Sequence, residues 1–406
     1  MTPALTPRRE FWLLVTLAGI QFTHILDFMI MMPLGPQFTA LFGITDAQFG
    51  LLVSAYTLAA GLSGLLASAY IDRFGRKRLL LWLYSLFALA TLACGLAPTY
   101  GALMGARIAA GVFGGVLSAL SQTIVADVIP FERRGRAMGI VMTAFAVSSV
   151  AGVPAGLFLA AHLSWHAPFF GIATVSAVLA LLALRTLPPL RGHLQGSDRP
   201  SPLGGIWQVL AARNHQRAFV FSALLMFAGF TVIPYITIYL QANAGVRPDQ
   251  IPLIYLAGGA LTLFTARLFG RLTDRLGKVV TFRRAALLAI VPMMATTLVQ
   301  PLPFWAILPV SCAFFVCMSG RMIPGMAILT SAADPALRGT FMTLNSAVQS
   351  AAMGLAAFTG GLIIGRDAHG LVQHYWMAGL LGAAAALGAV WMAPRLHLHG
   401  APAGLG

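Results

Sequence analysis

Twelve apolar segments of membrane-spanning length recur along this chain of 406 residues. An α-helix needs about 20 apolar residues to cross the hydrocarbon core of a bilayer. Only 9% of the residues are charged and 58% are hydrophobic, whereas about a quarter of an average soluble domain is charged. These features exclude an ordinary soluble enzyme, a disordered chain and a fibrous protein, and they predict an all-α polytopic membrane protein. The predicted spans are 11–33, 46–70, 78–97, 100–125, 136–161, 166–187, 216–242, 250–271, 281–299, 303–330, 340–365 and 371–393.

The 26 lysines and arginines are distributed unequally between the two sides of the predicted bundle. If the N-terminus is cytoplasmic, 21 of them lie on the cytoplasmic side, and only Arg247 and Arg366 lie in outer loops. The other three, Arg107, Arg267 and Arg321, lie within spans. This asymmetry follows the positive-inside rule and predicts that both termini are cytoplasmic. It also accounts for the net charge of +15 without a nucleic-acid partner.

Two pairs of similar segments indicate an internal duplication. The first half contains Asp72-Arg73-Phe74-Gly75-Arg76, and the second half contains Asp274-Arg275-Leu276-Gly277-Lys278, 202 residues later. A second pair, around Asp127 and Asp334, has a spacing of 207 residues. We therefore expect six-helix halves at 1–187 and 216–406, joined by a cytoplasmic linker at 188–215. Parallel halves of this kind place a substrate site near the membrane midplane, between them.

At these repeated loops the chain resembles the major facilitator superfamily, over nearly its whole length. The family's loop signature, G-x-L-x-D-R-x-G-R/K, is matched in both halves, with Ser68 in place of the first glycine in the first copy. Arg107 and the glycine four residues later resemble the proton-linked motif of the fourth helix. Gly152, Pro154 and Gly156 are similar to the antiporter motif of the fifth helix. The resemblance is greatest to twelve-helix drug:proton antiporters and sugar-efflux permeases, and it implies a monomeric transporter with two pseudo-symmetric halves.

Asp27 is the one residue of the eleven acidic residues that lies deep in a predicted span. A charged aspartate at a helix centre costs about 2.5–3.5 kcal/mol, and such residues usually face a cavity and mark a proton or ion path. Desolvation favours the neutral carboxyl group and a nearby cation favours the charged one, so alternate exposure would load and release a proton. Arg107 is the expected partner, because both residues lie about 10 Å below the outer surface. The alternatives are a structural hydrogen bond for Asp27 and outward snorkelling for Arg107.

Three further residues of the first span extend this candidate site. His24 lies on the same helical face as Asp27, where it could relay protons or donate to a substrate, although a lone histidine is more often a structural donor. Phe28 and Met31 follow four residues after His24 and Asp27, and they could form an apolar wall of the cavity. Lipid contact or ordinary core contacts are the alternative for both.

The second half contributes three candidate cavity residues. Arg321 is expected in the inner half of the tenth span, as a cavity lining or an inner gate contact. Asn345 and Gln349 share one face of the eleventh span, because they are four residues apart. They could hydrogen-bond a polar substrate or simply another helix.

The repeated loops predict a cytoplasmic gate. In the resembled family the aspartate of the first loop lies at the N-terminus of the eleventh helix, where an anion is stabilised by about 0.3–1 kcal/mol. We expect Arg76 to pair with Asp127, and Asp274, Asp334 and Arg275 to form a related cluster. In the fifth span, small residues and a proline allow close helix approach. The gate set is completed by Asp72, Arg73, Gly75 and Gly277, and the fifth-span motif consists of Gly152, Pro154 and Gly156.

These observations predict a secondary transporter of the bacterial inner membrane, not an enzyme. No phosphate-binding G-x-x-x-x-G-K-S/T motif is present, so ATP is not the expected power source. The two histidines His397 and His399 are too few for a metal site, and no cofactor is expected. We predict proton-coupled export of a small amphipathic or neutral compound, drug or sugar-like, with protons, that substrate and membrane lipids as the partners. Two alternatives remain open: a symporter or uniporter that imports a sugar or an organic acid, and a receptor or scaffold that transports nothing.

Overall fold

The computed structural model describes residues 6–70, 74–129, 131–188, 202–334 and 337–399. Within these residues, 12 helices are long and apolar enough to cross a membrane. Their bounds agree with the predicted spans to within a few residues; the predicted span 100–125, for example, corresponds to Tyr100–Val125. The predicted all-α membrane fold is therefore confirmed.

The chain forms two compact units. Unit 1 comprises Met1–Met31 and Leu58–Pro202, and unit 2 comprises Met32–Thr57 and Leu203–Gly406. The segment 32–57, which belongs to the first half of the sequence, thus groups with the second half. The helices of unit 1 are α1 (Pro7–Ile30), most of α3 (Asp46–Tyr70), α4 (Arg76–Leu96), α5 (Tyr100–Val128), α6 (Phe131–Val147), the π-helical turn η2 (Ser148–Gly152), α7 (Val153–His162) and α8 (Ala167–Thr186).

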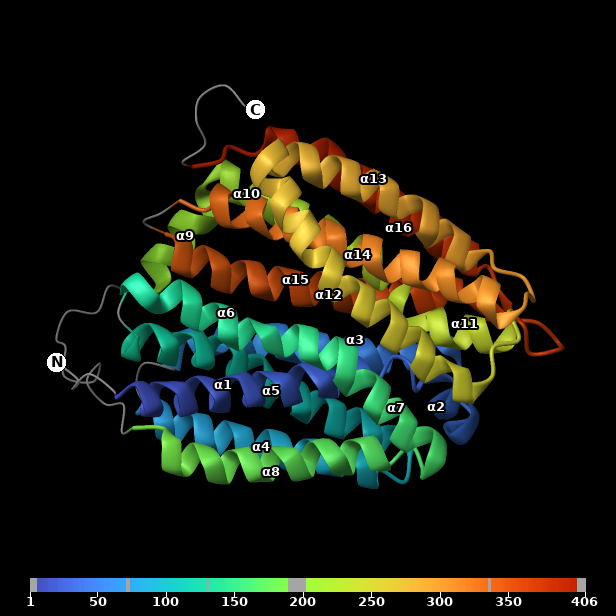
Figure 1. The fold of residues 1–406 in the computed structure, drawn as a ribbon, viewed down its shortest axis with the longest axis horizontal. Helices are drawn as coiled ribbons and strands as arrows, with labels where there is room; N and C mark the ends of the chain where they lie inside the picture. Colours follow the sequence, from blue (N-terminus) through green and yellow to red (C-terminus); the bar gives the residue numbers. More distant parts are fainter. Residues whose placement is uncertain (1–5, 71–73, 130, 189–201, 335–336, 400–406) are drawn as a thin grey trace. The chain divides into compact units, whose positions relative to one another are not determined.

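In unit 1, α1 contacts α5, α6, α7 and α8, and α4 lies against α5 and α8 (Figure 1). The fifth predicted span is interrupted by the turn η2 just before Pro154. A Cβ atom added at Gly152 would lie 3.0 Å from Leu26 Cδ1, and one at Gly156 would lie 2.7 Å from Ile30 Cδ1. Both neighbours belong to α1, so these glycines allow the fifth span to approach α1 closely.

Unit 2 contains the remaining helices and one short β-hairpin. Its central helix α10 contacts α14, α15 and α16. The hairpin strands are antiparallel, with Arg366 opposite Val372. The elements are α2 (Gly35–Phe42), the start of α3, α9 (Pro202–Ala211), α10 (Arg213–Phe230), η4 (Ile233–Tyr235), α11 (Ile236–Ala242), η5 (Pro248–Gln250), α12 (Ile251–Leu276), α13 (Lys278–Thr297), α14 (Phe304–Ala332), α15 (Arg338–Ile363), β1 (Gly365–Arg366), β2 (Val372–Gln373), α16 (Tyr375–Met392) and η6 (Ala393–Arg395). The predicted linker 188–215 thus contains α9 and the first turn of α10.

The seventh predicted span is broken between α10 and α11. Pro234 has no backbone N–H to continue the helix, and the carbonyl groups before it need other donors. The hydroxyl group of Tyr375 donates to the carbonyl oxygen of Val232 at 2.8 Å. On the other side, the hydroxyl group of Tyr235 donates to the carbonyl oxygen of Ala357. Two buried tyrosines therefore hold the broken helix against α15 and α16.

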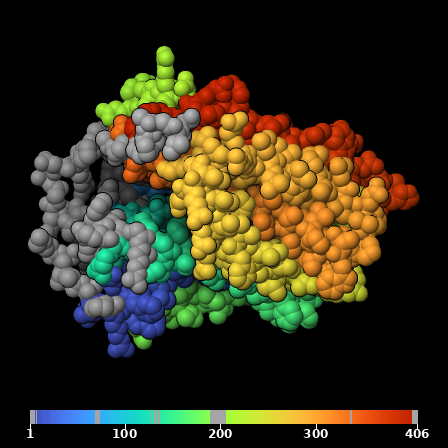
Figure 2. Space-filling model, turned by 45° about the horizontal axis from the view of Figure 1, so that its top comes forward, coloured from blue at the N-terminus to red at the C-terminus, as the bar shows by residue number. Residues whose placement is uncertain are grey.

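The outer surface of unit 2 is apolar. In Figure 2, α12 (yellow) and α14 (orange) lie side by side on the visible face. Both helices expose large apolar side chains, among them Leu256, Phe264, Leu268 and Trp305. The buried set, in contrast, includes serines, threonines, Arg321 and Asn345. Apolar residues outside and polar residues inside are the distribution expected of helices surrounded by lipid.

Candidate functional site

Asp27 and Arg107 form a fully buried ion pair within unit 1. Arg107 Nη1 donates to Asp27 Oδ2 at 2.8 Å and to the backbone carbonyl oxygen of Asp27 at 3.3 Å. The exposed fraction of both side chains is 0%. Asp27 lies three residues before the end of α1, and Arg107 lies in the first third of α5, so the two helices bring the charges together at the same depth. This is the pairing that the depth argument predicts.

One carboxylate oxygen of Asp27 accepts no hydrogen bond from Arg107. Its Oδ1 atom is buried and accepts no hydrogen bond within the described part of the chain. The buried Thr91 of α4 lies close to the same carboxyl group. A buried polar atom without a partner is uncommon and calls for an explanation. Here a proton, a water molecule or a substrate donor would satisfy it.

The other predicted residues of α1 surround this pair unequally. The imidazole ring of His24 lies edge-on to Phe87 of α4, with 6.0 Å between the ring centroids. Met31 is completely buried, and Phe28 is half-buried. His24 therefore has a defined ring contact in unit 1. This contact is compatible with a structural role for the imidazole ring and also with a role as a proton relay.

The predicted gate of the first half is described in part. Arg76 Nε, at the start of α4, donates to Asp127 Oδ2 near the end of α5 at 3.1 Å. Arg76 is buried and Asp127 is one-third exposed. Asp72 and Arg73 lie outside the described residues, and Gly75 precedes α4 with a φ of −61°, so its conformation does not require glycine.

The corresponding loop of the second half has a different arrangement. Asp274 and Arg275 are both exposed on the last turns of α12, and the structure records no ion pair for either among the residues that it describes. Asp334 follows α14, and its backbone N–H donates to His215 Nε2 at 3.1 Å. Gly277 has a φ of +88°, a left-handed conformation that favours glycine. The structure thus does not join Asp274 and Arg275 into the expected ion-pair cluster.

The polar candidates of α15 lie in the interior of unit 2. Gln349 Nε2 donates to Ser222 Oγ of α10 at 3.1 Å and contacts Met326 Sδ of α14 at 3.7 Å. Asn345 is also buried, and its Oδ1 atom has no hydrogen-bond partner among the described residues. Gln349 therefore connects three helices. This arrangement corresponds to the second of the two alternatives from the sequence, a hydrogen bond to another helix.

Arg321 is buried in the middle of α14. Only 3% of the residue is exposed. Two glycines bring neighbouring helices close to it: a Cβ atom at Gly325 would lie 2.8 Å from Leu225 of α10, and one at Gly229 of α10 would lie 3.0 Å from Arg321 Nη2. The guanidinium group of Arg321 therefore lies against α10 near the end of that helix.

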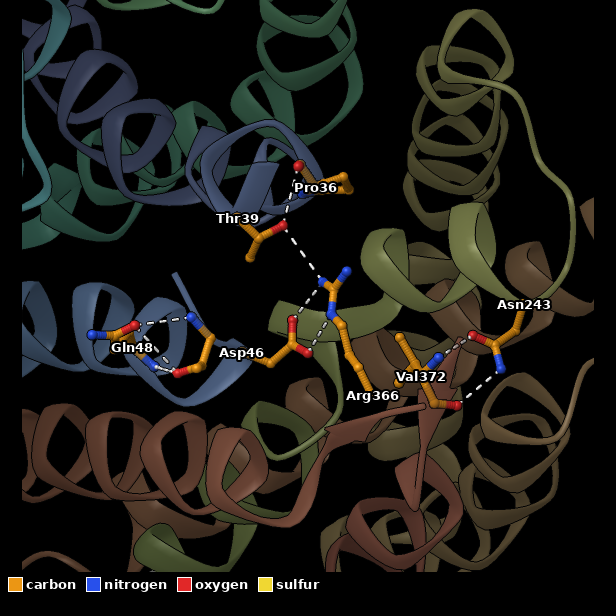
Figure 3. A network of polar contacts seen from close by, with 8 residues as sticks. Pro36, Thr39, Asp46, Gln48, Asn243, Arg366 and Val372 are labelled. Atoms are coloured by element: carbon orange, nitrogen blue, oxygen red, sulfur yellow. Dashed lines mark hydrogen bonds and ion pairs between the residues drawn. The ribbon is translucent and has the colours of Figure 1, made fainter. Parts of the chain in front are cut away.

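A third ion pair, which sequence reasoning missed, joins the start of α3 to strand β1 in unit 2 (Figure 3). Arg366 of β1 donates through Nε and Nη2 to the two carboxylate oxygens of Asp46 at 2.9 and 2.8 Å. Nη2 also reaches Thr39 Oγ1 of α2 at 3.5 Å. The hydrogen bonds that the Arg366 guanidinium donates to Asp46 raise the pKa of Arg366. The usable signal was that Asp46 begins a predicted span on the side where Arg366 is one of two basic residues.

The described residues contain no cluster of side chains that could bind a metal ion. Across the described ranges, no group of three or more histidine, cysteine, aspartate or glutamate side chains is placed to hold a metal ion. The buried charges are carried by arginines and single carboxylates instead. Such pairs suit the exchange of protons and the binding of small charged or polar molecules.

The sequence matches the model of the Major Facilitator Superfamily over residues 17–357. It is 25% identical over 346 residues to an uncharacterized MFS-type transporter, YceJ, of Bacillus subtilis (strain 168), covering 84% of this chain and 87% of that protein. A chloramphenicol resistance protein of Streptomyces lividans is 26% identical over 353 residues, covering 87% and 88%. A probable sugar efflux transporter of Helicobacter pylori (strain G27) is 26% identical over 232 residues, covering 57% and 58%.

Solved transporter structures share the fold. A bacterial homolog of the human lysosomal transporter Spinster, in an inward-facing and unoccupied conformation, superposes with a TM-score of 0.75 at 17% identity, covering 98% of this chain and 100% of that one. A D-xylose–proton symporter superposes with a TM-score of 0.73 at 18% identity, covering 95% and 97%. The matching family and these relatives are transporters and not enzymes. The chain, a multi-pass membrane transporter, therefore belongs to the Major Facilitator Superfamily.

Proposed function

We propose that this transporter exports a small amphipathic or neutral compound, drug-like or sugar-like, from the bacterial cytoplasm in exchange for protons. Both termini would lie in the cytoplasm, as the 21 basic residues on that side favour. The halves at 1–187 and 216–406 would alternate around a midplane site as a monomer, with the linker 188–215 between them. The names of the relatives from Streptomyces lividans and Helicobacter pylori favour export.

The observation that carries this proposal is the buried pair of Asp27 and Arg107. A proton on the unpartnered Oδ1 atom would cancel the charge of the carboxylate and weaken the 2.8 Å contact. Arg107 would keep its second hydrogen bond, to the Asp27 carbonyl oxygen at 3.3 Å, so the guanidinium group stays in place while the carboxyl group changes charge. The pair can therefore load and release a proton without rearranging the two helices.

Proton entry supplies enough energy for useful accumulation. One elementary charge that crosses 100 mV releases about 2.3 kcal/mol, which corresponds to a concentration gradient of about fifty-fold. The gate pair of Arg76 and Asp127, and the close approach of the fifth span to α1, would limit leakage during the cycle.

The test uses purified protein in liposomes that contain a pH-sensitive dye. Chloramphenicol and glucose are added outside as separate probes, and the lumen pH is followed. Antiport predicts that the lumen becomes alkaline as a probe enters, whereas symport predicts that it becomes acidic. Asp27→Asn should abolish the pH change and uphill movement but leave downhill exchange of the probe.

The matched control is Asp249→Asn, which removes an exposed carboxylate paired with Arg247 in a predicted outer loop. It should transport like the unmodified protein. Full proton-coupled transport by Asp27→Asn would refute proton coupling through this residue. A transport-dead receptor would show no movement of any probe in either protein.

A further inference from the structure

Arg321 is a buried cation, and no carboxylate in the described part of the chain forms an ion pair with it. The residue is 3% exposed, and its Nε atom has no hydrogen-bond partner in the described part of the chain. Among the described residues, the ion pairs of unit 2 are those of Arg247 and Arg366, and none involves Arg321. A charge removed from water in this way is costly unless a partner of opposite sign is close.

The sequence of unit 2 explains why none of the acidic residues of this unit pairs with Arg321. The unit has five acidic residues in all, and each lies in the first or last turn of a helix or outside the helices: Asp46, Asp249, Asp274, Asp334 and Asp367. Arg321, in contrast, lies eleven residues before the end of α14 at Ala332. At 1.5 Å per residue this places its Cα atom about 16 Å from that end. The acidic residues of unit 2 are therefore too far along the helices to serve as its partner.

The end of α10 offers a partial charge but not a full one. Nη2 of Arg321 lies against Gly229, one residue before α10 ends at Phe230. The C-terminal end of a helix carries about half a negative charge, which helps a cation to remain charged. Within the described residues, however, Arg321 donates no hydrogen bond to the carbonyl groups there. Among the residues that the structure describes, the positive charge of Arg321 is therefore only partly compensated, and its N–H groups donate no hydrogen bond.

From this geometry we infer that Arg321 binds the anionic group, such as a carboxylate, of the transported compound. The inference rests on the proposed transport function and narrows its substrate class to amphipathic organic anions. The absence of a side chain at Gly229 lets Nη2 lie close to α10, and Met318 and Ile233 lie beside the same glycine. Gln349 lies eleven residues after the start of α15, at the same depth along its helix as Arg321. It adds an amide group to mostly apolar surroundings.

A guanidinium group favours this class for a specific reason. Its planar fork donates two parallel hydrogen bonds to a carboxylate, and both become stronger away from water. An amide of the same shape offers one carbonyl oxygen and no charge. The carboxylate should therefore bind at least tenfold more tightly than its amide, because a hydrogen bond to a charged group is worth more than one to a neutral group.

The experiment compares three aromatic acids with their amides on purified full-length protein in detergent. The probes are benzoate, salicylate and cinnamate, against benzamide, salicylamide and cinnamamide, and affinity is measured by titration of intrinsic tryptophan fluorescence. We expect at least one acid to bind tenfold or more tightly than its amide. Arg321→Gln should remove this preference, and Arg321→Lys, which keeps the charge without the fork, should retain part of it.

Three further variants keep the result interpretable. Arg267→Gln removes an exposed arginine from the neighbouring helix α12 and should leave the preference intact. Gly229→Ala keeps the Arg321 charge but displaces Nη2, so it should weaken the preference even if Arg321→Gln does not fold. Asp27→Asn should lose uphill transport and keep the preference.

The outcomes separate this inference from the proposed function. If no acid binds better than its amide to the unmodified protein, or if Arg321→Gln and Gly229→Ala both retain the preference, the anion site is refuted. Loss of the preference in Arg321→Gln together with normal proton coupling in Asp27→Asn would instead refute the proposed coupling and leave the anion site standing.

Discussion

The ion pair between Asp46 and Arg366 should stabilise unit 2 measurably, and the perturbation that tests this is a double-mutant cycle. The single changes are Asp46→Asn and Arg366→Gln, and the double variant carries both. Each single change leaves one member of a two-bond contact without its partner (Figure 3). The double variant removes both charges and lets the two amides hydrogen-bond to each other.

The magnitude follows from the burial of the two side chains. Asp46 is 2% exposed, whereas Arg366 is 38% exposed. Loss of one partner from a fully buried pair costs about 3–5 kcal/mol, and an exposed pair contributes about 0.2–1 kcal/mol. Because water reaches the guanidinium group but hardly reaches the carboxylate, we expect a coupling energy of about 2 kcal/mol, between these limits. Arg366→Gln should be the more damaging single change, since it leaves the buried carboxylate uncompensated.

The sign of the pH dependence is also determined. Asp46 raises the pKa of Arg366 in the folded protein above the pKa of an unfolded arginine. The stabilisation that the ion pair gives is therefore complete below the pKa of the unfolded arginine. It is lost only as the pH rises through the higher pKa of Arg366 in the folded protein. Deprotonation of Arg366 should therefore not weaken the coupling between about pH 7 and 9.

The assay is unfolding of the purified protein in mixed micelles with increasing sodium dodecyl sulfate, followed by tryptophan fluorescence. The matched control is the pair of Arg247 and Asp249, also in unit 2 and also separated by 2.8 Å, but with both side chains at least 60% exposed. The control should give a coupling energy near zero. If the single changes at 46 and 366 are additive to within about 0.5 kcal/mol, the pair contributes no more than the exposed control, and the argument from burial fails.

Two further predictions concern unit 1. Gly115→Ala would place a Cβ atom 2.6 Å from Ala60 Cα, and closer still to its carbonyl oxygen; because backbone atoms cannot rotate away, we expect a loss of about 1–3 kcal/mol in the same unfolding assay. Gly101→Ala on the same helix meets nothing within 4 Å and should be neutral or slightly stabilising, and equal effects of the two changes would contradict the close contact. Arg76→Gln should lower stability by about 1–2 kcal/mol through its pair with Asp127, and a variant as stable as the unmodified protein would show that the pair is only a surface contact.

The spans could be predicted from the sequence because membrane thickness and charge placement leave few choices. A segment of about 20 apolar residues flanked by charge clusters has one way to lie in a bilayer. The helix breaks could not be predicted with the same rules. Pro234 accompanies a break, whereas Pro292 and Pro324 lie inside the continuous helices α13 and α14. Distant residues take part in the break at Pro234: the hydroxyl group of Tyr375 donates a second hydrogen bond to the Val232 carbonyl oxygen, which also accepts from the backbone N–H of Tyr235.

The candidate site shows the same limit. Depth in the membrane alone predicts the contact between Asp27 and Arg107. Each residue of a straight helix adds about 1.5 Å, so the depth of a side chain follows from its distance to the predicted helix end. Depth could not connect Asp46 with Arg366, which are 320 residues apart and belong to a helix start and a hairpin strand. Nor could it show that segment 32–57 groups with the second half. Contacts made by loops depend on the tertiary fold and not on a repeated spacing.

The three arginines that the sequence places inside spans meet three different environments, and the comparison explains their presence. Arg267 is exposed on α12, where a long side chain can reach the headgroups, and Arg107 has a carboxylate at 2.8 Å. Arg321 has neither water nor a carboxylate among the described residues. An apolar residue of similar volume would stabilise such a site in the resting protein. The charge at position 321 therefore opposes stability, and it is understood most simply as serving a negatively charged molecule that enters during the transport cycle.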